Sequence, residues 1–360
     1  MIIDRLWLTD FRNHRSTELR LDHQVSLITG RNGHGKTNLL EAIALLSGAR
    51  SFRGASADAL VMAGAAAAVV RAEVVRDDRT SLVEMQLAPG KTRAQVNRQA
   101  VRRLRDLSDV VRVVVFGPDD LDLVKGAPAG RRTVIDDVLS DIDVRFRQDR
   151  IDLDRILRQR NNLLRQAKGR LNPDVASTLD VWDSQLGVVG EAVTRARRQL
   201  LDDLGPLVEQ FYTSVAGGTD HVALRYHCSW GTATLTAALS EGRVDELRRA
   251  TTLVGPHRDD IVIELNGLPA RTHASQGEQR SLALALRLAV HHRITSVMGD
   301  PPLVLLDDVF SELDDHRATR LIDCLPVAQI VLTSATGTVP PGIRPGLVVE
   351  VRNGEIGEVG

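Results

Sequence analysis

The sequence predicts an α/β fold in which a nucleotide-binding lobe, built of mixed β strands around a P-loop core, carries an inserted helical second lobe. Three observations predict it: a glycine-rich loop between a strand and a helix, an apolar strand pattern that ends in two aspartates, and a helical middle section. With 360 residues, the chain has room for one large domain or two ordinary ones. We expect residues 1–125 and 245–360 to form the nucleotide-binding lobe and residues 126–244 to form the mostly helical insertion.

The first 120 residues are rich in strand patterns. Alternating apolar and polar residues predict early strands at 3–8 and 18–21. Three more strand patterns and one nearly continuous β-branched run, typical of a strand covered on both faces, follow at 69–75, 81–87, 93–96 and 110–116.

The pattern becomes helical after Gly126. Apolar residues at helical spacing predict helices at 131–140, at 144–168, and from 174 to about 204. In the rest of the chain, the pattern predicts helices at 235–250, 281–294 and 315–325. It predicts strands at 221–230, 301–306 and 330–333, and a hairpin around Asn266-Gly267.

Residues 30–37 match G-x-x-x-x-G-K-[ST], the P-loop pattern, in the strand–loop–helix context that the motif requires. Glycines let backbone N–H groups turn toward phosphate, and the start of the following helix favours the same anion. The predicted phosphate-binding residues are Gly30, Arg31, Asn32, Gly33, His34, Gly35, Lys36 and Thr37. Lys36 would reach the β- and γ-phosphates, and the Thr37 hydroxyl would hold Mg²⁺. The pattern therefore predicts a site for a nucleoside triphosphate such as ATP.

The apolar run Leu303–Leu306 leads directly into Asp307 and Asp308, which is typical of a Walker B strand. Asp307 would hold Mg²⁺, directly or through water, and Asp308 would orient or polarise the attacking water. The alternative interpretation is an ordinary strand that ends in an acidic turn. The upstream P-loop favours the Walker B interpretation.

A second candidate phosphate site begins at Ser275, where Ser-Gln-Gly-Glu-Gln opens an amphipathic helix. A serine hydroxyl, the backbone of Gly277 and a helix N-terminus all favour an anion. The alternative is a plain helix cap, because Ser275 with Glu278 three residues later is a good capping box.

The order of these segments resembles the ABC/SMC ATPase class. Ser275–Gln279 lies where that class has its signature, and Ser311–Asp314 lies where it has its D-loop. Within the class, the chain is similar to the RecF family over essentially its whole length. The matching stretches include Phe11-Arg12-Asn13, the P-loop, Phe116–Leu121 and, most specifically, Gly-Pro-His-Arg-Asp-Asp at 255–260.

The resemblance implies an ABC/SMC-like ATPase head without a long coiled coil. It implies an ATP-dependent homodimer in which Ser275, Gly277 and Glu278 of one copy contact the nucleotide of the other. It further implies slow, DNA-dependent hydrolysis and binding to gapped or double-stranded DNA near single-strand junctions. The implied partners are RecR and RecO, and through them RecA, in recombinational repair, replication and the SOS response.

Basic residues suggest where DNA could bind, although the net charge of −1 gives no global attraction. Nine of them fall in one helical region: Arg145, Arg147, Arg150, Arg155, Arg158, Arg160, Arg165, Lys168 and Arg170. Such a stripe could contact backbone phosphates, but it could equally be a solvated helix face that pairs with Asp149, Asp152 and Asp154. The low aromatic content of 3% argues against base stacking.

Two other functional classes fit the P-loop but not the rest of the sequence. An ABC-transporter ATPase subunit needs a Q-loop glutamine after 110–116 and a switch histidine after 330–332, and neither is found. A GTPase needs an Asn-Lys-x-Asp motif, and no Asn-Lys pair occurs. No apolar run approaches the roughly 20 residues that span a bilayer, so we expect a cytoplasmic protein with no membrane partner.

Overall fold

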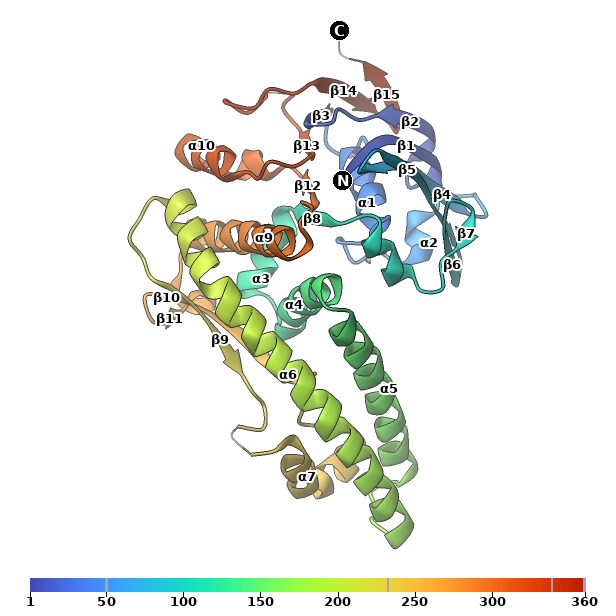
Figure 1. The fold of residues 1–360 in the computed structure, drawn as a ribbon, viewed down its shortest axis with the longest axis vertical. Coiled ribbons are helices and arrows are strands. Elements are labelled where there is room, and N and C mark those ends of the chain that lie inside the picture. The colour runs from blue at the N-terminus through green and yellow to red at the C-terminus, as the bar shows by residue number, and fades with distance from the viewer. Residues whose placement is uncertain (49–50, 232, 338, 359–360) are drawn as a thin grey trace. The chain divides into compact units, whose positions relative to one another are not determined.

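A mostly parallel six-stranded sheet places the P-loop strand and the aspartate-bearing strand on either side of one shared neighbour (Figure 1). Its order is β15 (Glu355–Glu358), β14 (Leu347–Arg352), β3 (Val25–Thr29), β13 (Ile330–Ser334), β12 (Leu303–Leu306) and β8 (Val113–Phe116). All neighbours pair in parallel except β15, which is antiparallel to β14. Because parallel strands end at one edge, the residues after β3, β12 and β13 meet there.

The computed structural model describes residues 1–48, 51–231, 233–337 and 339–358. It divides into two compact units, and the parallel sheet belongs to the first. Unit 1 comprises Met1–Asp120, Phe211–Gly218 and Ala283–Gly360, and unit 2 comprises Leu121–Gln210 and Thr219–Leu282.

Unit 1 contains a second, antiparallel sheet that shares a core with the first. Its order is β2 (His14–Arg20), β1 (Ile2–Phe11), β4 (Ala68–Arg76), β5 (Arg79–Ala88), β6 (Lys91–Val96) and β7 (Gln99–Ala100). Helix α1 (Lys36–Leu45) contributes Leu39, Leu40 and Ile43 to a buried cluster that also includes residues of both sheets. Burial on all sides of α1 fixes the helix behind the P-loop. The other elements of unit 1 are α2 (Ala57–Leu60), η1 (Leu104–Asp109), η2 (Pro118–Asp120), η3 (Val309–Glu312) and α10 (Asp315–Cys324).

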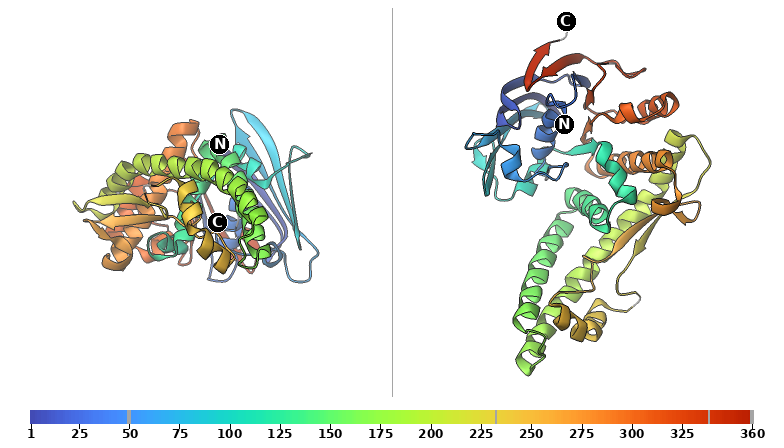
Figure 2. Two further views of the ribbon diagram at one scale, coloured as in Figure 1. Left: turned by 90° about the horizontal axis from the view of Figure 1, so that it is seen from below. Right: turned by 180° about the vertical axis from the view of Figure 1, so that it is seen from behind.

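Unit 2 is mostly helical and includes a small antiparallel sheet of order β11 (Leu268–Pro269), β10 (Asp260–Leu265), β9 (Val222–His227). Its helices are α3 (Leu121–Lys125), α4 (Pro128–Ile142), α5 (Val144–Gln166), α7 (Leu235–Arg249), α8 (Ala270–His273) and the larger part of α6 (Pro173–Ala216). Helices α5 and α6 run alongside each other in the views of Figure 1 and Figure 2. Leu164, Leu179 and Leu247 form a buried cluster that joins α5, α6 and α7.

Most predicted elements lie within a few residues of an observed one, and the predicted α/β fold class is confirmed. One boundary was wrong: α6 was expected to end near Leu204 but continues to Ala216 in spite of Pro206. The buried residues Leu204, Val208, Tyr212 and Val215 continue the helical period past the proline. Their burial offsets the roughly 3 kcal/mol that an interior proline costs. Strands β14 and β15 have no counterpart among the predicted elements.

The division into units also differs from the predicted lobes. Residues 245–282, which the sequence analysis assigned to the nucleotide-binding lobe, group with the helices. The physical reason is pairing: β10 pairs with β9 over six residues, and Arg131 of α4 bonds Asp260 at the start of β10. Within the described residues, no helix is both long enough and apolar enough to span a bilayer.

Candidate nucleotide-binding site

The P-loop forms a turn between β3 and α1 that leaves the start of the helix open. The N-cap residue is Gly35, which makes no side-chain capping bond, so the first N–H groups of α1 remain available to an anion. Gly35 has φ +115°, and a Cβ there would lie 2.6 Å from Asn13 Oδ1, so only glycine fits. This geometry suits a phosphate group.

Lys36 is held inside the loop by oxygen acceptors. Its ammonium donates to the carbonyls of Gly30 at 2.7 Å and Arg31 at 3.2 Å. Burial lowers the pKa of Lys36, and the nearby Asp308 and Asp307 carboxylates oppose that shift. Neutral carbonyls hold the charge without cancelling it, so the ammonium keeps its positive charge for an anion.

Asp307, Thr37 and Thr333 converge at the strand edge. Thr37 Oγ1 donates to Asp307 Oδ1 at 2.8 Å, and Thr333 Oγ1 donates to the same oxygen at 2.9 Å. Burial raises the pKa of Asp307, and these two hydrogen bonds oppose the increase. A carboxylate and a hydroxyl are hard oxygen donors that fit Mg²⁺, whose remaining ligands are normally phosphate and water. No group of three or more His, Cys, Asp or Glu side chains suited to a metal occurs in the part of the chain that the structure describes.

Asp308 is oriented by its backbone. Its φ of +51° is left-handed, and its N–H donates to Thr333 Oγ1 at 2.9 Å. Thr333 therefore ties the two aspartates to β13. This residue was missed by the sequence analysis, which assigned only the strand.

A set of contacts from outside the motif braces the P-loop. Asn13 Nδ2 donates to the His34 carbonyl at 2.8 Å, and Asn13 Oδ1 accepts from Asn38 at 2.8 Å. The amide of Gly354, in the turn between β14 and β15, also donates to the His34 carbonyl, at 2.9 Å. A Cβ on Gly354, with φ +85°, would lie 2.0 Å from the Asn13 carbonyl oxygen. His34 is thus fixed through its backbone from two sides.

His14 completes the brace. Its Nε2 lies 3.1 Å from the Gly35 carbonyl oxygen and its Nδ1 lies 3.0 Å from Thr17 Oγ1. Burial lowers the pKa of His14, which favours the neutral ring. The Thr17 hydroxyl in turn donates to the Gly354 carbonyl at 3.2 Å, so His14 and Thr17 link the P-loop to the turn between β14 and β15. Neither His14 nor Gly354 was proposed from the sequence.

Arg12 and Glu41 form an ion pair beside this brace. Arg12 bonds both carboxylate oxygens of Glu41 at 2.9 Å and the Ala59 carbonyl at 2.9 Å. Glu41 is completely buried and also accepts from Ser51 at 2.5 Å. The Arg12 guanidinium is therefore engaged in holding α1 and the segments after it.

The signature segment lies in unit 2 and forms the capping box. The Ser275 amide donates to Glu278 Oε2 at 2.6 Å, and the Glu278 amide donates to Ser275 Oγ at 3.3 Å. Ser275 is exposed, and its hydroxyl accepts in this box, so its own proton remains free to donate. The Glu278 carboxylate is engaged with the cap. Gly277, in the first turn of α9 (Gln276–Met298), lies next to it.

The Gly-Pro-His-Arg-Asp-Asp segment is bound within unit 2. His257 Nε2 and the Arg258 guanidinium both donate to the Thr252 carbonyl. Asp259 accepts from the Tyr226 hydroxyl at 2.5 Å, and Asp260 pairs with Arg131 at 2.9 Å. The segment is thus a polar turn held by hydrogen bonds to the Thr252 carbonyl and by the Arg131–Asp260 ion pair.

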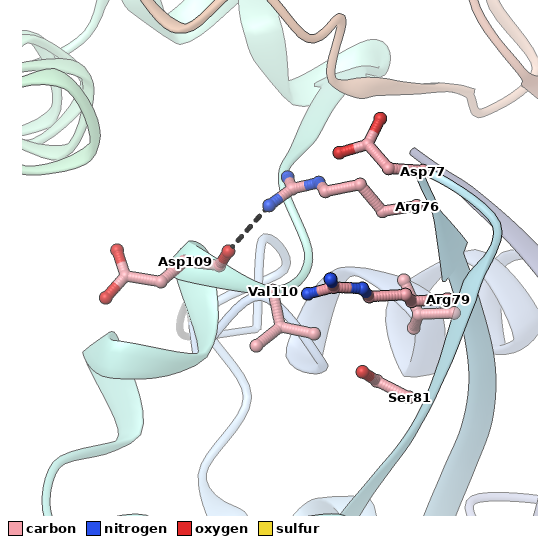
Figure 3. A pocket seen from close by; sticks show the side chains of 7 residues that line it. Arg76, Asp77, Arg79, Ser81, Asp109 and Val110 are labelled. Carbon is pink, nitrogen blue, oxygen red and sulfur yellow. Dashed lines mark hydrogen bonds between the residues drawn. The ribbon is translucent and has the colours of Figure 1, made fainter.

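A pocket elsewhere in unit 1 contains none of the predicted site residues (Figure 3). It is lined by Val74, Arg76, Asp77, Arg79, Ser81, Asp109 and Val110. The Arg76 guanidinium donates to the Asp109 carbonyl at 3.0 Å and pairs with Asp300 at 2.6 Å. The Arg76 charge is thus already paired.

Comparisons with known proteins agree with this geometry. The sequence model of the RecF/RecN/SMC N-terminal domain family matches residues 2–339. The DNA replication and repair protein RecF of Acidothermus cellulolyticus is 42% identical over 93% of this chain and 94% of its own length. That of Frankia alni is 42% identical over 99% of both chains.

Solved structures give the same result. A structure described as the recombination mediator protein RecF with ATP, in the RecFOR pathway, is 28% identical, covers 99% of this chain and 97% of its own, and has a TM-score of 0.91. A Pyrococcus furiosus Smc head domain, 15% identical over 99% of this chain and 95% of its own, shares the fold with a TM-score of 0.56. The chain therefore belongs to the RecF family of DNA replication and repair proteins, within the RecF/RecN/SMC group of ATPase heads.

Proposed function

We propose that this chain is an ATP-gated DNA-binding protein of recombinational repair. The observation that carries the proposal is the convergence of an uncapped P-loop helix, the Lys36 ammonium and the Thr37–Asp307 pair at one sheet edge. The similarity over nearly the full length to a RecF structure described with ATP supports ATP as the nucleotide.

The chain's own residues supply three functions at this site. The N–H groups at the start of α1 and the Lys36 ammonium bind phosphate oxygens. Thr37 and Asp307 hold Mg²⁺, which neutralises phosphate charge when it is bound. Asp308, which lies beside Asp307 but is one methylene shorter than glutamate, orients water weakly, in keeping with slow hydrolysis.

ATP joins two copies in this proposal. The P-loop of one copy and the exposed Ser275 hydroxyl of the other contact the same γ-phosphate, with Gly277 and Glu278 shaping the second contact. Because both contacts need the γ-phosphate, ATP stabilises the dimer and hydrolysis releases it.

The dimer binds gapped or duplex DNA and acts with RecR and RecO to help load RecA in replication, repair and the SOS response. The names of the curated relatives and the RecFOR description of the solved structures support this assignment. No feature of the described site favours a transporter or GTPase function over it.

The test is retention of gapped duplex DNA by the purified chain without nucleotide, with Mg·ATP, and with a non-hydrolysable analogue. We expect ATP and the analogue to increase the retained fraction, and Asp308→Asn to prolong retention with ATP because its dimer hydrolyses ATP more slowly. DNA affinity that is the same with and without ATP would refute the gating.

A further inference from the structure

The basic stripe on α5 is divided by the structure into a neutralised part and an exposed part. Arg160 is completely buried and pairs with Asp183 at 2.7 Å and Glu246 at 2.6 Å. Arg147 is buried and donates to the Ser140 carbonyl at 3.0 Å. These two arginines stabilise unit 2 and are not available to a ligand.

The first turns of α5 are also unsuited to a polyanion. Arg150 pairs with Asp137 at 2.9 Å. Burial raises the pKa of Asp149, and the charges of Asp143 and Asp152 raise it further, so acidic groups crowd this end of the helix. Arg145 is exposed among these acids. The local field here does not attract phosphate.

The C-terminal end of α5 and the turn into α6 differ from this acidic start of the helix in their charge. No acidic residue occurs from Arg155 to Pro173, although six basic residues do. Four of these are exposed and form no ion pair with any carboxylate of the described residues: Arg158, Arg165, Lys168 and Arg170. We call these four residues the distal basic patch.

The geometry of the distal basic patch suits a nucleic-acid backbone. Arg158 and Arg165 lie seven residues apart on the exposed face of α5, or about 10 Å along the helix, which corresponds to about three phosphates of one strand. Gln159, Asn162 and Gln166 are exposed on the same side and can donate to phosphate or sugar oxygens. No aromatic residue occurs from 155 to 173, so base stacking contributes nothing here.

From these observations we infer that the distal basic patch, at the α5–α6 hairpin, is a contact site for the phosphate backbone of duplex DNA. The inference rests on the proposed DNA-binding function and assigns part of it to particular residues. Contacts to phosphate oxygens do not depend on the base sequence. The acidic residues nearest along the chain are Asp154 and Asp174, each four positions from an end of the patch, so two negative charges flank four positive ones.

The experiment measures binding of the full chain to duplex DNA with Mg·ATP as a function of salt. The variant Lys168→Glu/Arg170→Glu is compared with Lys91→Glu/Arg93→Glu, which makes the same charge change in an exposed Lys-x-Arg pair on β6. We expect the first variant to lose affinity at least about tenfold and to reduce the slope of log affinity against log salt by about 2, or about 0.9 per phosphate contact. The β6 variant should stay within about twofold of the unsubstituted chain.

Three outcomes overturn the inference. Equal affinity and slope in both variants would show that the distal basic patch does not meet DNA, even if it binds an acidic protein. Equal losses in both variants would show a general charge effect. If the unsubstituted chain does not bind DNA at all, the proposed function fails together with the inference.

A crosslinking measurement does not depend on how the charge reversal affects folding. A photo-crosslinker on Lys168→Cys should join duplex DNA, whereas the same reagent on Lys91→Cys should give only the background of the unsubstituted chain, whose Cys228 and Cys324 are also free. Equal crosslinking from both positions would contradict the assignment.

Discussion

Helices α1 and α9 both begin at a sequence that attracts phosphate, yet their first turns differ in how their donors are used. At α1 the N-cap is Gly35 and no side chain caps the helix. At α9 the cap is complete, because Ser275 and Glu278 satisfy each other's backbone amides. The first helix start is ready for an anion, whereas at the second the Ser275 and Glu278 amides are already bonded within the capping box. We therefore expect α1 to provide affinity for ATP and α9 to provide response to it.

The strongest test of this difference is removal of the Lys36 ammonium. Lys36→Ala should lower ATP affinity at least about 100-fold, because the only side-chain cation donating within the loop is lost. Lys36→Arg should retain some binding but block turnover. Fluorescent-nucleotide titration and phosphate release measure the two effects, with Lys91→Ala as the exposed-lysine control. Normal hydrolysis in Lys36→Arg would contradict the assigned role.

The next test separates capping from phosphate contact at α9. Ser275→Asp keeps a good N-cap but adds a negative charge, and Ser275→Arg removes the cap and adds bulk. Both should abolish ATP-induced dimers in light scattering without weakening ATP binding by the monomer. Only Ser275→Arg should also lower thermal stability, by about 1 kcal/mol. Dimers that persist in Ser275→Asp would mean that this helix start does not meet the γ-phosphate.

A smaller effect is expected where the P-loop is braced. Asn13→Ala removes the bonds to His34 and Asn38, so the loop should lose order and ATP affinity should fall about 10-fold. Isothermal titration measures the change. Asn97→Ala, in an exposed turn of the same sheet, serves as the control for loss of an asparagine side chain. An unchanged ATP affinity in Asn13→Ala would show that the P-loop keeps its shape unaided.

The smallest effect concerns acid sensitivity in unit 2. Burial lowers the pKa of His257 to about 4, and nearby Arg258 and Arg132 add to the decrease. A base with a lowered pKa in the folded state contributes stability that is complete above its unfolded pKa of about 6.5. That stability is lost as pH falls toward 4. Urea unfolding should show a loss of about 2 kcal/mol between pH 7 and pH 5, reduced in His257→Gln. An identical pH dependence in both proteins would refute the assignment.

The sequence was sufficient to locate the residues that belong to a short motif. The P-loop, Asp307 and the capping box at Ser275 were identified because their partners are neighbours in the chain or follow a fixed pattern. His14, Thr333 and Gly354 were missed because their partners are distant in sequence. For example, the Thr17 hydroxyl donates to the carbonyl of Gly354, which lies 337 residues later in the chain. The pairing of β14 with β3 and of β13 with β12 brings such residues together.

The basic stripe shows a second limit. Periodicity places Arg160 and Arg165 on the same helix, but it cannot tell which of them faces a carboxylate. Arg160 is neutralised by Asp183 on α6 and Glu246 on α7, whose packing no local pattern specifies. The extension of α6 past Pro206 was missed for a related reason, since the burial of Tyr212 depends on its neighbours in the fold.

The position of β14 has a consequence for protein synthesis. This strand pairs with β3, and the turn after it, at Gly354, holds the carbonyl of His34, about 320 residues earlier. A ribosome makes the nucleotide loop long before it makes the segment that fixes its shape. A nascent chain halted before residue 347 would thus display the P-loop motif without the segment that fixes its shape.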